Sequence, residues 1–288
     1  MDERAALEAL GERVDAAGDD CAVVGESVLT TDMLHEKTDF PAGVTKYTAG
    51  WRAVGASLSD VAAMGAEARA ALAVYAAPEF DDDLLAFVDG AHDVCERVGA
   101  EYVGGDLDTH EEFTVATTAM GRTTNPVFRS GASVGEAVCV TGTLGRSAAA
   151  LRLFEAGETE RANELFQFTP RVAAGRAIAP VASAMMDISD GLARSLHQMA
   201  DASDCGISVT ESLPIDESVA EVAGDERERR ELGTFFGEDF ELLFTVSEAD
   251  LGALAEKSSV PVTRIGTVVE EGVTRDGEAL PDRGYTHG

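Results

Sequence analysis

The chain has 288 residues with 22 basic and 53 acidic side chains, which give a formal net charge of −31 at pH 7. This length allows one large domain or two ordinary ones, each with a proper core. The negative charge repels nucleic acid and no basic patch interrupts it, so a nucleic-acid-binding protein is excluded. No apolar run approaches the ~18 residues of a membrane span, so a membrane protein is excluded as well.

In chain order, apolar periodicity and turn residues predict a mixture of helices and strands. The first half is predicted to contain a helix over 3–17, strands over 21–24 and 27–31, a loop over 34–48, a helix over 50–64, a strand over 68–76, a helix over 81–98, a strand that ends at Gly104-Gly105, and a strand over 113–121. The second half is predicted to contain a strand over 137–141, helices over 147–155, 170–183 and 190–204, and strands over 206–210, 240–246 and 262–269. The mixture predicts an α/β (α+β) fold, and Asn125-Pro126 marks a domain boundary between 1–125 and 126–288.

The distribution of charge indicates a saline environment. Acids run through the whole chain, and the lysines are only Lys37, Lys46 and Lys257. Such a surface is typical of proteins from a high-salt cytoplasm, where concentrated counterions screen the self-repulsion of the folded state, and it indicates a halophilic archaeon as the source. The alternative, an acidic protein with an unusual tail, is disfavoured because no block of five or six acids occurs.

The four cysteines, Cys21, Cys95, Cys139 and Cys205, are far apart and form no C-x-x-C pair. This spacing favours neither a zinc ribbon nor a redox motif, so each cysteine is expected to be a small buried apolar residue in a reducing compartment. The N-terminal Met-Asp-Glu-Arg lacks the basic-then-apolar order of a signal peptide. The sequence therefore predicts a cytoplasmic protein.

Five short acidic motifs each lie where a predicted strand or helix ends. They are Gly18-Asp19-Asp20, Thr30-Thr31-Asp32, Ser57-Leu58-Ser59-Asp60, Gly104-Gly105-Asp106 and Asp187-Ile188-Ser189-Asp190-Gly191. Carboxylates beside hydroxyls and glycines are hard oxygen ligands, the kind that Mg²⁺ takes when it holds nucleotide phosphates. Any one motif is a common turn, but together they predict a site that several loops build around several metal ions.

Asp60 is the most telling of these residues, because it lies near the C-terminal end of an apolar helix, where the helix dipole disfavours a carboxylate. An aspartate turned to solvent would be the ordinary explanation. However, Ser57 and Ser59 accompany it in a segment of closely packing Ala, Val and Leu residues, and a nearby cation explains this combination better. The pattern favours metal ligation.

The other motifs leave alternatives open when each is taken alone. Gly104-Gly105 could let the backbone approach a bound group or simply form a turn. Ser189 or Asp190 could cap the helix that follows. Arg129 could hold a phosphate or be an ordinary surface arginine. Val140–Gly145 could bind an anion at a helix start, but it lacks the third glycine of a dinucleotide fingerprint and is predicted to be structural.

Taken in order, the motifs resemble the thiamine-monophosphate kinase family, which belongs to the superfamily that includes aminoimidazole ribonucleotide synthetase. The matching stretches cover nearly the whole chain and are Gly18–Val24, Thr31–Leu34, Leu58–Ala66, Gly104–Asp106, Arg129–Ala132, Val140–Gly145, Met186–Leu192 and Gly237–Thr245. The strings Leu-Ser-Asp-Val-Ala-Ala-Met-Gly-Ala and Asp-Ile-Ser-Asp-Gly-Leu make the match specific. No P-loop, protein-kinase or H-E-x-x-H signature competes with it.

The resemblance implies a two-domain synthetase-like fold and a homodimer. Residues 1–125 would bind ATP and Mg²⁺ and dimerise, with a mixed sheet that forms a β-barrel with a second copy, and residues 126–288 would form an α/β domain. The implied reaction transfers the γ-phosphoryl group of ATP directly to thiamine monophosphate and gives thiamine diphosphate. No covalent enzyme nucleophile is expected, because the acceptor phosphate is itself a nucleophile that metal clamping and in-line positioning can use.

The resemblance also implies roles for individual residues. The metal ligands would be Asp20, Thr30, Thr31, Asp32, Asp60, Asp106, Asp187 and Asp190. ATP would contact Gly105, Asp106, Arg129 and Ser189, and the thiamine substrate would contact Asp39, Glu238 and Tyr285.

Three departures from the family pattern all fall on the acceptor side. Asp39-Phe40 stands where the family usually has a histidine before the phenylalanine, and Phe236 replaces the first glycine of a Gly-Gly-Glu-Asp. Tyr285 is the nearest candidate for a C-terminal aromatic contact.

Two other readings compete with this one. The first is another enzyme of the superfamily, such as aminoimidazole ribonucleotide synthetase or a selenophosphate synthetase. The latter would need a reactive residue in a glycine-rich loop, whereas Cys21 lies in a run that reads as buried. The second is a hydrogenase-maturation-like carrier, which would present a C-terminal cysteine, whereas this chain ends Tyr-Thr-His-Gly.

Overall fold

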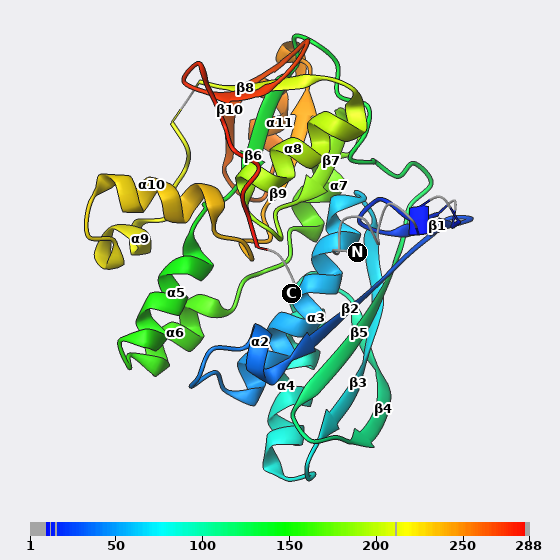
Figure 1. Cartoon of the computed structure of the whole chain (residues 1–288). Coiled ribbons are helices and arrows are strands. Elements are labelled where there is room, and N and C mark those ends of the chain that lie inside the picture. Colours follow the sequence, from blue (N-terminus) through cyan, green and yellow to red (C-terminus); the bar gives the residue numbers. More distant parts are fainter. Residues whose placement is uncertain (1–9, 12, 15, 211, 286–288) are drawn as a thin grey trace.

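A computed structural model gives the structure of the protein and describes residues 10–285 except 12, 15 and 211 (Figure 1). The helix predicted over 3–17 lies mostly outside the described residues. The strands are β1 Ala22–Val24, β2 Ser27–His35, β3 Glu67–Ala77, β4 Glu101–Thr109, β5 Thr114–Arg122, β6 Ala137–Thr141, β7 Ala182–Asp187, β8 Gly206–Val209, β9 Leu242–Val246, β10 Val262–Val269, β11 Val273–Arg275 and β12 Glu278–Ala279. The helices are α2 Glu36–Asp39, α3 Lys46–Ala63, α4 Asp82–Val98, α5 Arg146–Glu155, α6 Thr159–Phe166, α7 Val172–Ile178, α8 Leu192–Ser203, α9 Glu217–Val222, α10 Glu226–Phe235 and α11 Glu248–Lys257.

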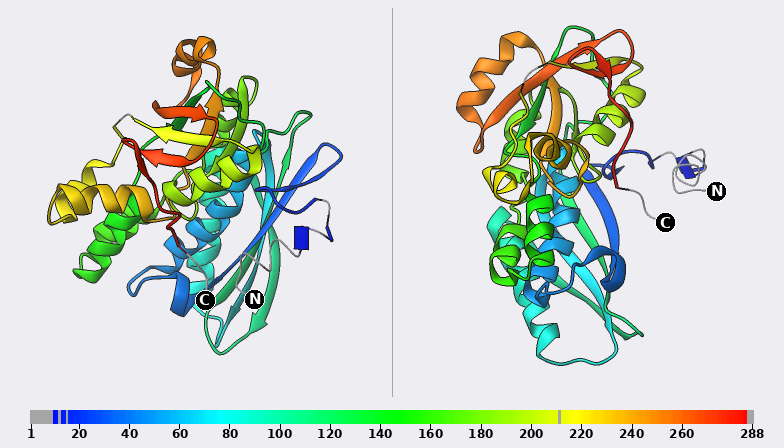
Figure 2. Two further views of the ribbon diagram at one scale, coloured as in Figure 1. Left: turned by 45° about the horizontal axis from the view of Figure 1, so that its top comes forward. Right: turned by 60° about the vertical axis from the view of Figure 1, so that its left-hand side comes forward.

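The strands form two mixed sheets, which confirms the predicted α/β mixture (Figures 1 and 2). The first has the strand order β1-β2-β5-β3-β4, and only its β3–β4 pair is parallel. A parallel pair needs a long crossover, and α4 supplies it. The second sheet has the order β12-β11-β8-β10-β6-β9-β7, with β8 and β11 as its parallel pair. Among the described residues the first sheet is open, with β1 and β4 at its edges, and it forms no closed barrel by itself.

The first sheet buries one face and exposes the other, as the two-residue period of a strand dictates. Along β2, Val28, Thr30 and Asp32 alternate with Leu29, Thr31 and Met33; Val28 is fully buried, whereas Met33 is 57% exposed. Helices α3 and α4 pack on the buried side, where small residues permit a close approach. A side chain at Gly50 or Gly90 would collide with the backbone of the opposite helix.

Helix α3 lies in the middle of the molecule, between the two sheets (Figure 1). It begins after the cap Thr45, whose side chain accepts the backbone N–H of Thr48, and its last residues pack against α7 and β7. One core therefore contains Leu58 of α3 together with Met185 and Leu242 of the second sheet. Because the two halves share this core, residues at the end of α3 can meet residues at the end of β7.

Several predicted elements had wrong bounds. Part of the loop predicted over 34–48 is regular, because β2 extends to His35 and α2 and the start of α3 follow. The helix predicted over 170–183 is the shorter α7, and residues 182–187 form β7 because they pair with the buried strand β9. The strand expected to end at Gly104-Gly105 continues to Thr109 as β4. No helix in the described part of the chain is long and apolar enough to cross a bilayer.

Candidate functional site

Three aspartates from distant parts of the sequence meet where the two sheets adjoin. Asp20 precedes β1, Asp60 lies in the last turn of α3, and Asp187 ends β7. A carboxylate oxygen of each lies within 4.8 Å of one from the other two. We call Asp20, Asp60 and Asp187 the carboxylate cluster. Sequence analysis had assigned all three to metal ligation.

Hydroxyl groups hold the carboxylates of this region in place. Thr30 donates a hydrogen bond to Asp60 at 2.6 Å, and Ser59 donates one to Asp187 at 2.7 Å. The neighbouring Asp32 accepts a hydrogen bond of 2.6 Å from Ser57. The small hydroxyl residues of α3 therefore face the site, which explains their place in an otherwise apolar helix.

The cluster places negative charges close together in a poorly hydrated position. Burial raises the pKa of Asp187 to about 7, against the opposing effect of its hydrogen bond from Ser59. Burial also raises the pKa of Asp60, and the charges of Asp32, Asp187 and Asp20 raise it further. Such crowding is costly unless protons or a cation compensate it. The arrangement is therefore suited to hold positive charge.

The donor set fits Mg²⁺. It consists only of oxygen atoms, and one of them, Oδ2 of Asp20, is buried without a hydrogen-bond partner among the described residues. Hard cations prefer such ligands, and a buried acceptor without a donor costs free energy that a bound cation would recover.

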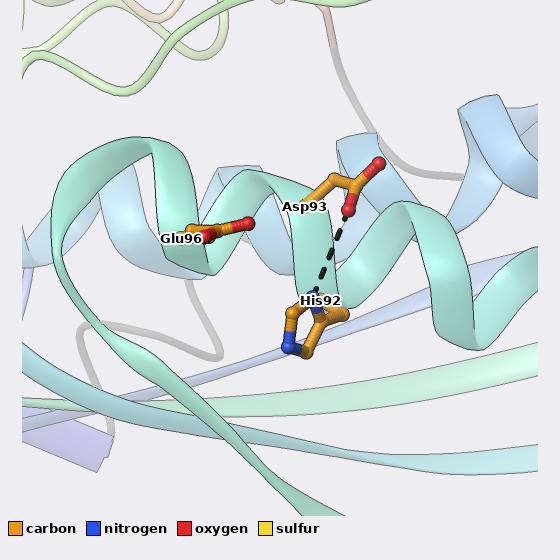
Figure 3. A group of neighbouring side chains, drawn as sticks. All are labelled: His92, Asp93 and Glu96. Carbon is orange, nitrogen blue, oxygen red and sulfur yellow. Dashed lines mark ion pairs between the residues drawn. The ribbon is translucent and has the colours of Figure 1, made fainter.

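A second group of possible metal ligands lies on α4, but it is exposed and includes a histidine nitrogen. His92, Asp93 and Glu96 are all exposed, and their one ion pair joins His92 Nδ1 to Asp93 Oδ1 at 3.7 Å (Figure 3). Asp93 also accepts a hydrogen bond of 2.7 Å from the Tyr47 hydroxyl. Water can solvate these groups, so they need no cation.

Arg129 lies beside the cluster, and its contact with ATP stays a prediction. Its guanidinium is 3.0 Å from Asp20, and its backbone N–H is held by Asp19 at 3.1 Å. The charges of Asp20 and Asp19 raise the pKa of Arg129 although burial alone would lower it. Sequence analysis included Asp19 in the Gly18-Asp19-Asp20 motif but assigned metal ligation only to Asp20.

Asp190 and Ser189 follow the cluster residue Asp187 at the start of α8. Asp190 is half-buried, and its charge contributes to the raised pKa of Asp187, whereas Ser189 is exposed. The N-cap residue of α8 is Gly191, which makes no side-chain cap hydrogen bond. The alternative that Ser189 or Asp190 serves as the helix cap was therefore wrong.

The other predicted ligands lie apart from the cluster within one chain. Thr31 is on the exposed face of β2, and its hydroxyl donates to the backbone carbonyl of Thr117. Gly105 pairs with Ala73, which is in register with Asp32 through β5. Gly105 is thus three strands from Asp32, a distance of roughly 14 Å. Asp106 follows it on an exposed edge strand.

The two glycines before Asp106 have a structural explanation. Gly104 has a φ of +119°, and the register between β3 and β4 shifts beside it, as in a β-bulge. A side chain at Gly105 would collide with the carbonyl oxygen of Ala73. The alternative of a simple turn is therefore wrong, and the glycines bend an edge strand.

The three residues predicted to contact the acceptor line one cavity of ≈580 Å³. They come from distant segments: Asp39 from α2, Glu238 from the segment before β9, and Tyr285 from the C-terminal segment. The Tyr285 hydroxyl lies 3.5 Å from Asp39, so these two side chains meet across the cavity. The other lining residues include Lys37, Phe40, Phe166, Phe235, Phe236 and Gly237.

Backbone hydrogen bonds connect this cavity to the carboxylate cluster. The N–H of Glu238 donates to the carbonyl of Ser189, and the N–H of Phe240 donates to that of Ile188. The N–H of Tyr285 donates to the carbonyl of Asp190. The segment that directly follows the cluster residue Asp187 is therefore hydrogen-bonded to two residues of the cavity wall, Glu238 and Tyr285.

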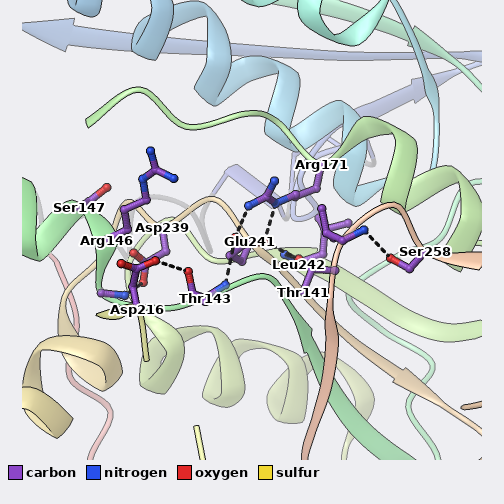
Figure 4. Close-up of polar contacts among 12 residues, drawn as sticks. Thr141, Thr143, Arg146, Ser147, Arg171, Asp216, Asp239, Glu241, Leu242 and Ser258 are labelled. Atoms are coloured by element: carbon purple, nitrogen blue, oxygen red, sulfur yellow. Dashed lines mark hydrogen bonds and ion pairs between the residues drawn. The ribbon is translucent and has the colours of Figure 1, made fainter. Parts of the chain in front are cut away.

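Polar groups of the turn at 140–145 form hydrogen bonds with acidic side chains from other segments of the protein (Figure 4). Thr141 donates to Glu241, which also pairs with Arg171, and Thr143 donates to Asp216. The N–H of Gly145 at the start of α5 donates to Asp239 at 2.8 Å, where an anion would otherwise bind. These contacts favour the structural role predicted for this turn.

Comparisons with known proteins agree with this geometry. Residues 18–123 match the family model of the AIR synthase related protein, N-terminal domain, and residues 133–276 match that of its C-terminal domain. Thiamine-monophosphate kinase of Halobacterium salinarum is 60% identical over 100% of both chains, and that of Methanospirillum hungatei is 41% identical over 100% of this chain and 99% of its own. The solved structure of AaThiL complexed with AMPPCP and TMP is 30% identical, covers 100% of this chain and 97% of its own, and superposes with a TM-score of 0.90. By these similarities the chain belongs to the thiamine-monophosphate kinase family of AIR-synthase-related proteins.

Proposed function

We propose that the protein transfers the γ-phosphoryl group of ATP to thiamine monophosphate and forms thiamine diphosphate. The observation that carries this proposal is the convergence of Asp39, Glu238 and Tyr285 on one cavity that is bonded to the carboxylate cluster. The family relationship supports the same activity, since the Halobacterium salinarum relative is a thiamine-monophosphate kinase at 60% identity.

Mg²⁺ at the carboxylate cluster would neutralise and orient the phosphates of both substrates. In this proposal the chain supplies the ligands Asp20, Asp60 and Asp187, with Asp32 and Thr30 beside them, and Arg129 supplies a positive charge to the nucleotide phosphates. Ser189, Asp190, Thr31, Gly105 and Asp106 stay predictions for contacts with metal or ATP. The acceptor phosphate itself attacks, so the chain positions the reactants and excludes water rather than forming a covalent intermediate.

The cavity has the chemistry that a cationic heteroaromatic acceptor needs. Thiamine carries a positive charge on its thiazolium ring, and aromatic faces and carboxylates both attract such a cation. Phe166, Phe235 and Phe236 provide apolar surface, while Asp39 and Glu238 provide negative charge. Asp39 would replace the family histidine as an acidic contact, and Tyr285 would be the C-terminal aromatic contact.

We further propose that the exposed face of the first sheet pairs with a second copy in a homodimer. Five large apolar side chains with exposures of 36–57% lie on this face, namely Leu29, Met33, Leu72, Val74 and Met120. Exposed apolar patches of this kind mark interaction sites. Two such sheets facing each other would form the barrel that the family resemblance implies. They would also bring Asp106 of one chain near a second copy.

A purified-protein assay tests the proposed reaction. ATP, Mg²⁺ and thiamine monophosphate should give ADP and thiamine diphosphate in equal amounts. Free thiamine should be a poor acceptor, because it lacks the phosphate that the cluster would position. Turnover of an aminoimidazole ribonucleotide precursor, without turnover of thiamine monophosphate, would overturn the proposal in favour of the other enzyme class.

A further inference from the structure

Arg52 is a buried arginine that the proposed reaction does not yet use. It lies on α3, is only 4% exposed, and follows Trp51. Most residues of this helix are small or apolar. Its guanidinium lies 3.5 Å from the centre of the Phe166 ring and donates to the Phe166 carbonyl at 2.6 Å. Burial of an arginine is costly, so its contacts must compensate the lost hydration.

The guanidinium of Arg52 holds Glu238, a wall residue of the acceptor cavity. Its Nη2 lies 3.0 Å from Oε2 of the Glu238 carboxylate and 3.4 Å from the Glu238 carbonyl oxygen. Burial lowers the pKa of Arg52, and the charge of Glu238 raises it in opposition, as expected for a matched pair. The carboxylate is thus tied through one oxygen.

The backbone of Glu238 is fixed as well. Its φ is +63°, a left-handed conformation that a glutamate rarely adopts. The Ser147 hydroxyl donates to its carbonyl at 2.6 Å, and its own N–H donates to the Ser189 carbonyl. A conformation of this kind persists only where its surroundings over-determine it, and it is found most often at functional sites.

One helix therefore sets the distance between the cavity and the carboxylate cluster. Arg52 and Asp60 both belong to α3 and are eight positions apart, which corresponds to ~12 Å along a helix axis. In-line transfer requires a rigid connection between the acceptor site and the metal site. An acceptor that is held loosely loses its orientation relative to the donor phosphate.

We propose that Arg52 is a positioning residue that fixes Glu238 as a contact for the acceptor. The inference rests on the proposed function, because it assigns the cavity to thiamine monophosphate. Within the described residues, the second carboxylate oxygen of Glu238 has no protein hydrogen-bond partner, so it is available to a ligand that carries donors or positive charge. Arg52 fixes the direction in which that oxygen faces.

Steady-state kinetics of Arg52→Met and Glu238→Gln test this inference. Each variant should raise the KM for thiamine monophosphate on the order of tenfold, as expected for the loss of a charged hydrogen bond. The KM for ATP should change less than about twofold, because the ATP side lies at the other end of α3. The double variant should be no worse than the poorer single variant, since both changes remove one interaction. Arg52→Lys, which keeps the charge but not the planar fork, should recover part of the loss.

A matched control separates positioning from stability. Arg171 forms a half-buried pair with the buried Glu241 and does not line the cavity. Arg171→Met should lower the melting temperature and leave the KM for thiamine monophosphate unchanged. The fluorescence of Trp51, the one tryptophan of the chain, reports whether the helix around position 52 keeps its packing.

Two results would overturn the role of Arg52 while leaving the proposed reaction intact. One is an Arg52→Met enzyme that is less stable but keeps the wild-type KM for thiamine monophosphate. The other is a double variant in which the effects of Arg52→Met and Glu238→Gln on the KM for thiamine monophosphate add fully. Failure of the wild-type enzyme to phosphorylate thiamine monophosphate would instead overturn the proposed function itself. If Arg52→Met does not fold, Glu238→Gln and Arg52→Lys still decide the question, because they keep size or charge at the pair.

Discussion

Thr30 and Asp60 are joined by a hydrogen bond of 2.6 Å from the threonine hydroxyl to the carboxylate, which ties the buried face of β2 to the last turn of α3. This contact holds a carboxylate at a helix end whose dipole disfavours it, beside the negative charges of Asp32, Asp187 and Asp20. Such an arrangement costs folding stability, and a bound cation would repay that cost.

Asp60→Asn should therefore separate catalysis from stability. We expect the rate of phosphoryl transfer to fall on the order of 10²-fold or more, as for the loss of a metal ligand or an electrostatic clamp. The metal-free variant should be slightly more stable than the wild type at pH 8, because it lacks a crowded negative charge. At pH 5 the difference should shrink, because burial and the neighbouring acids raise the pKa of Asp60 and so favour its neutral form as the pH falls. Thermal melting at both values, with the exposed Asp89→Asn as control, checks this, and wild-type turnover in Asp60→Asn would remove Asp60 from the site.

The affinity for Mg²⁺ should rise between about pH 6 and 8. The pKa of Asp187 is raised to about 7, and a carboxylate must lose its proton before it binds a metal. The stability of the metal-free protein should change in the opposite sense. A folded-state pKa above the unfolded value of ~3.9 stabilises the fold at low pH, and this contribution is lost as the pH rises through about 7.

Titration calorimetry of Mg²⁺ at pH 6, 7 and 8 measures the first effect. Buffers with different ionisation enthalpies should reveal proton release on binding at pH 7. Asp187→Asn should reduce both the affinity and the dependence on pH. An affinity that does not vary over this range would show that Asp187 is already ionised in the metal-free protein.

The net charge of −31 predicts a strong dependence of stability on salt. Repulsion between acids extends over a screening length of ~10 Å at 0.1 M salt and only ~3 Å at 1 M, so the melting temperature should rise with KCl. Mg²⁺ with ATP should partly replace KCl, because it neutralises the densest acidic site and binds only the folded state. A melting series in KCl, with and without Mg-ATP, measures both effects. A melting temperature that is independent of KCl would contradict the predicted adaptation to high salt.

A charge on the exposed face of the first sheet should prevent dimerisation. Val74 lies in the middle of that face on β3, and Val74→Glu would place an uncompensated carboxylate in an apolar interface. Sedimentation velocity in molar KCl should show a dimer for the wild type and a monomer for this variant. Leu85→Glu is the matched control, because Leu85 is an exposed apolar residue of α4 rather than of the sheet. A dimer that survives Val74→Glu would place the interface elsewhere.

The sequence by itself determined the kind of fold and most of its elements. The bounds of α4, β3 and β6 follow from periodicity and from the caps Asp81 and Gly99, because these signals act over a few neighbouring residues. It also identified the cluster residues Asp20, Asp60 and Asp187, because acids among small and hydroxyl residues are locally unusual. The sequence analysis did not predict α2, α6, α9, α10, α11, β7, β11 or β12. The short elements α2 and β7 were missed because tertiary pairing rather than propensity decides them.

The tertiary structure alone decided which residues meet. Only the shared core around α3 brings Asp187 to Asp60, and only the chain path places Tyr285 beside Asp39, 246 positions earlier. It also placed Gly105 three strands from Asp32 in the first sheet, with Asp106 next to Gly105 on the same edge strand, and the sequence motifs did not predict this separation. Arg52 carried no signal of its role, because its partner Glu238 is 186 positions away. Contacts of this range depend on how sheets and helices pack, and the local pattern of residues does not encode that packing.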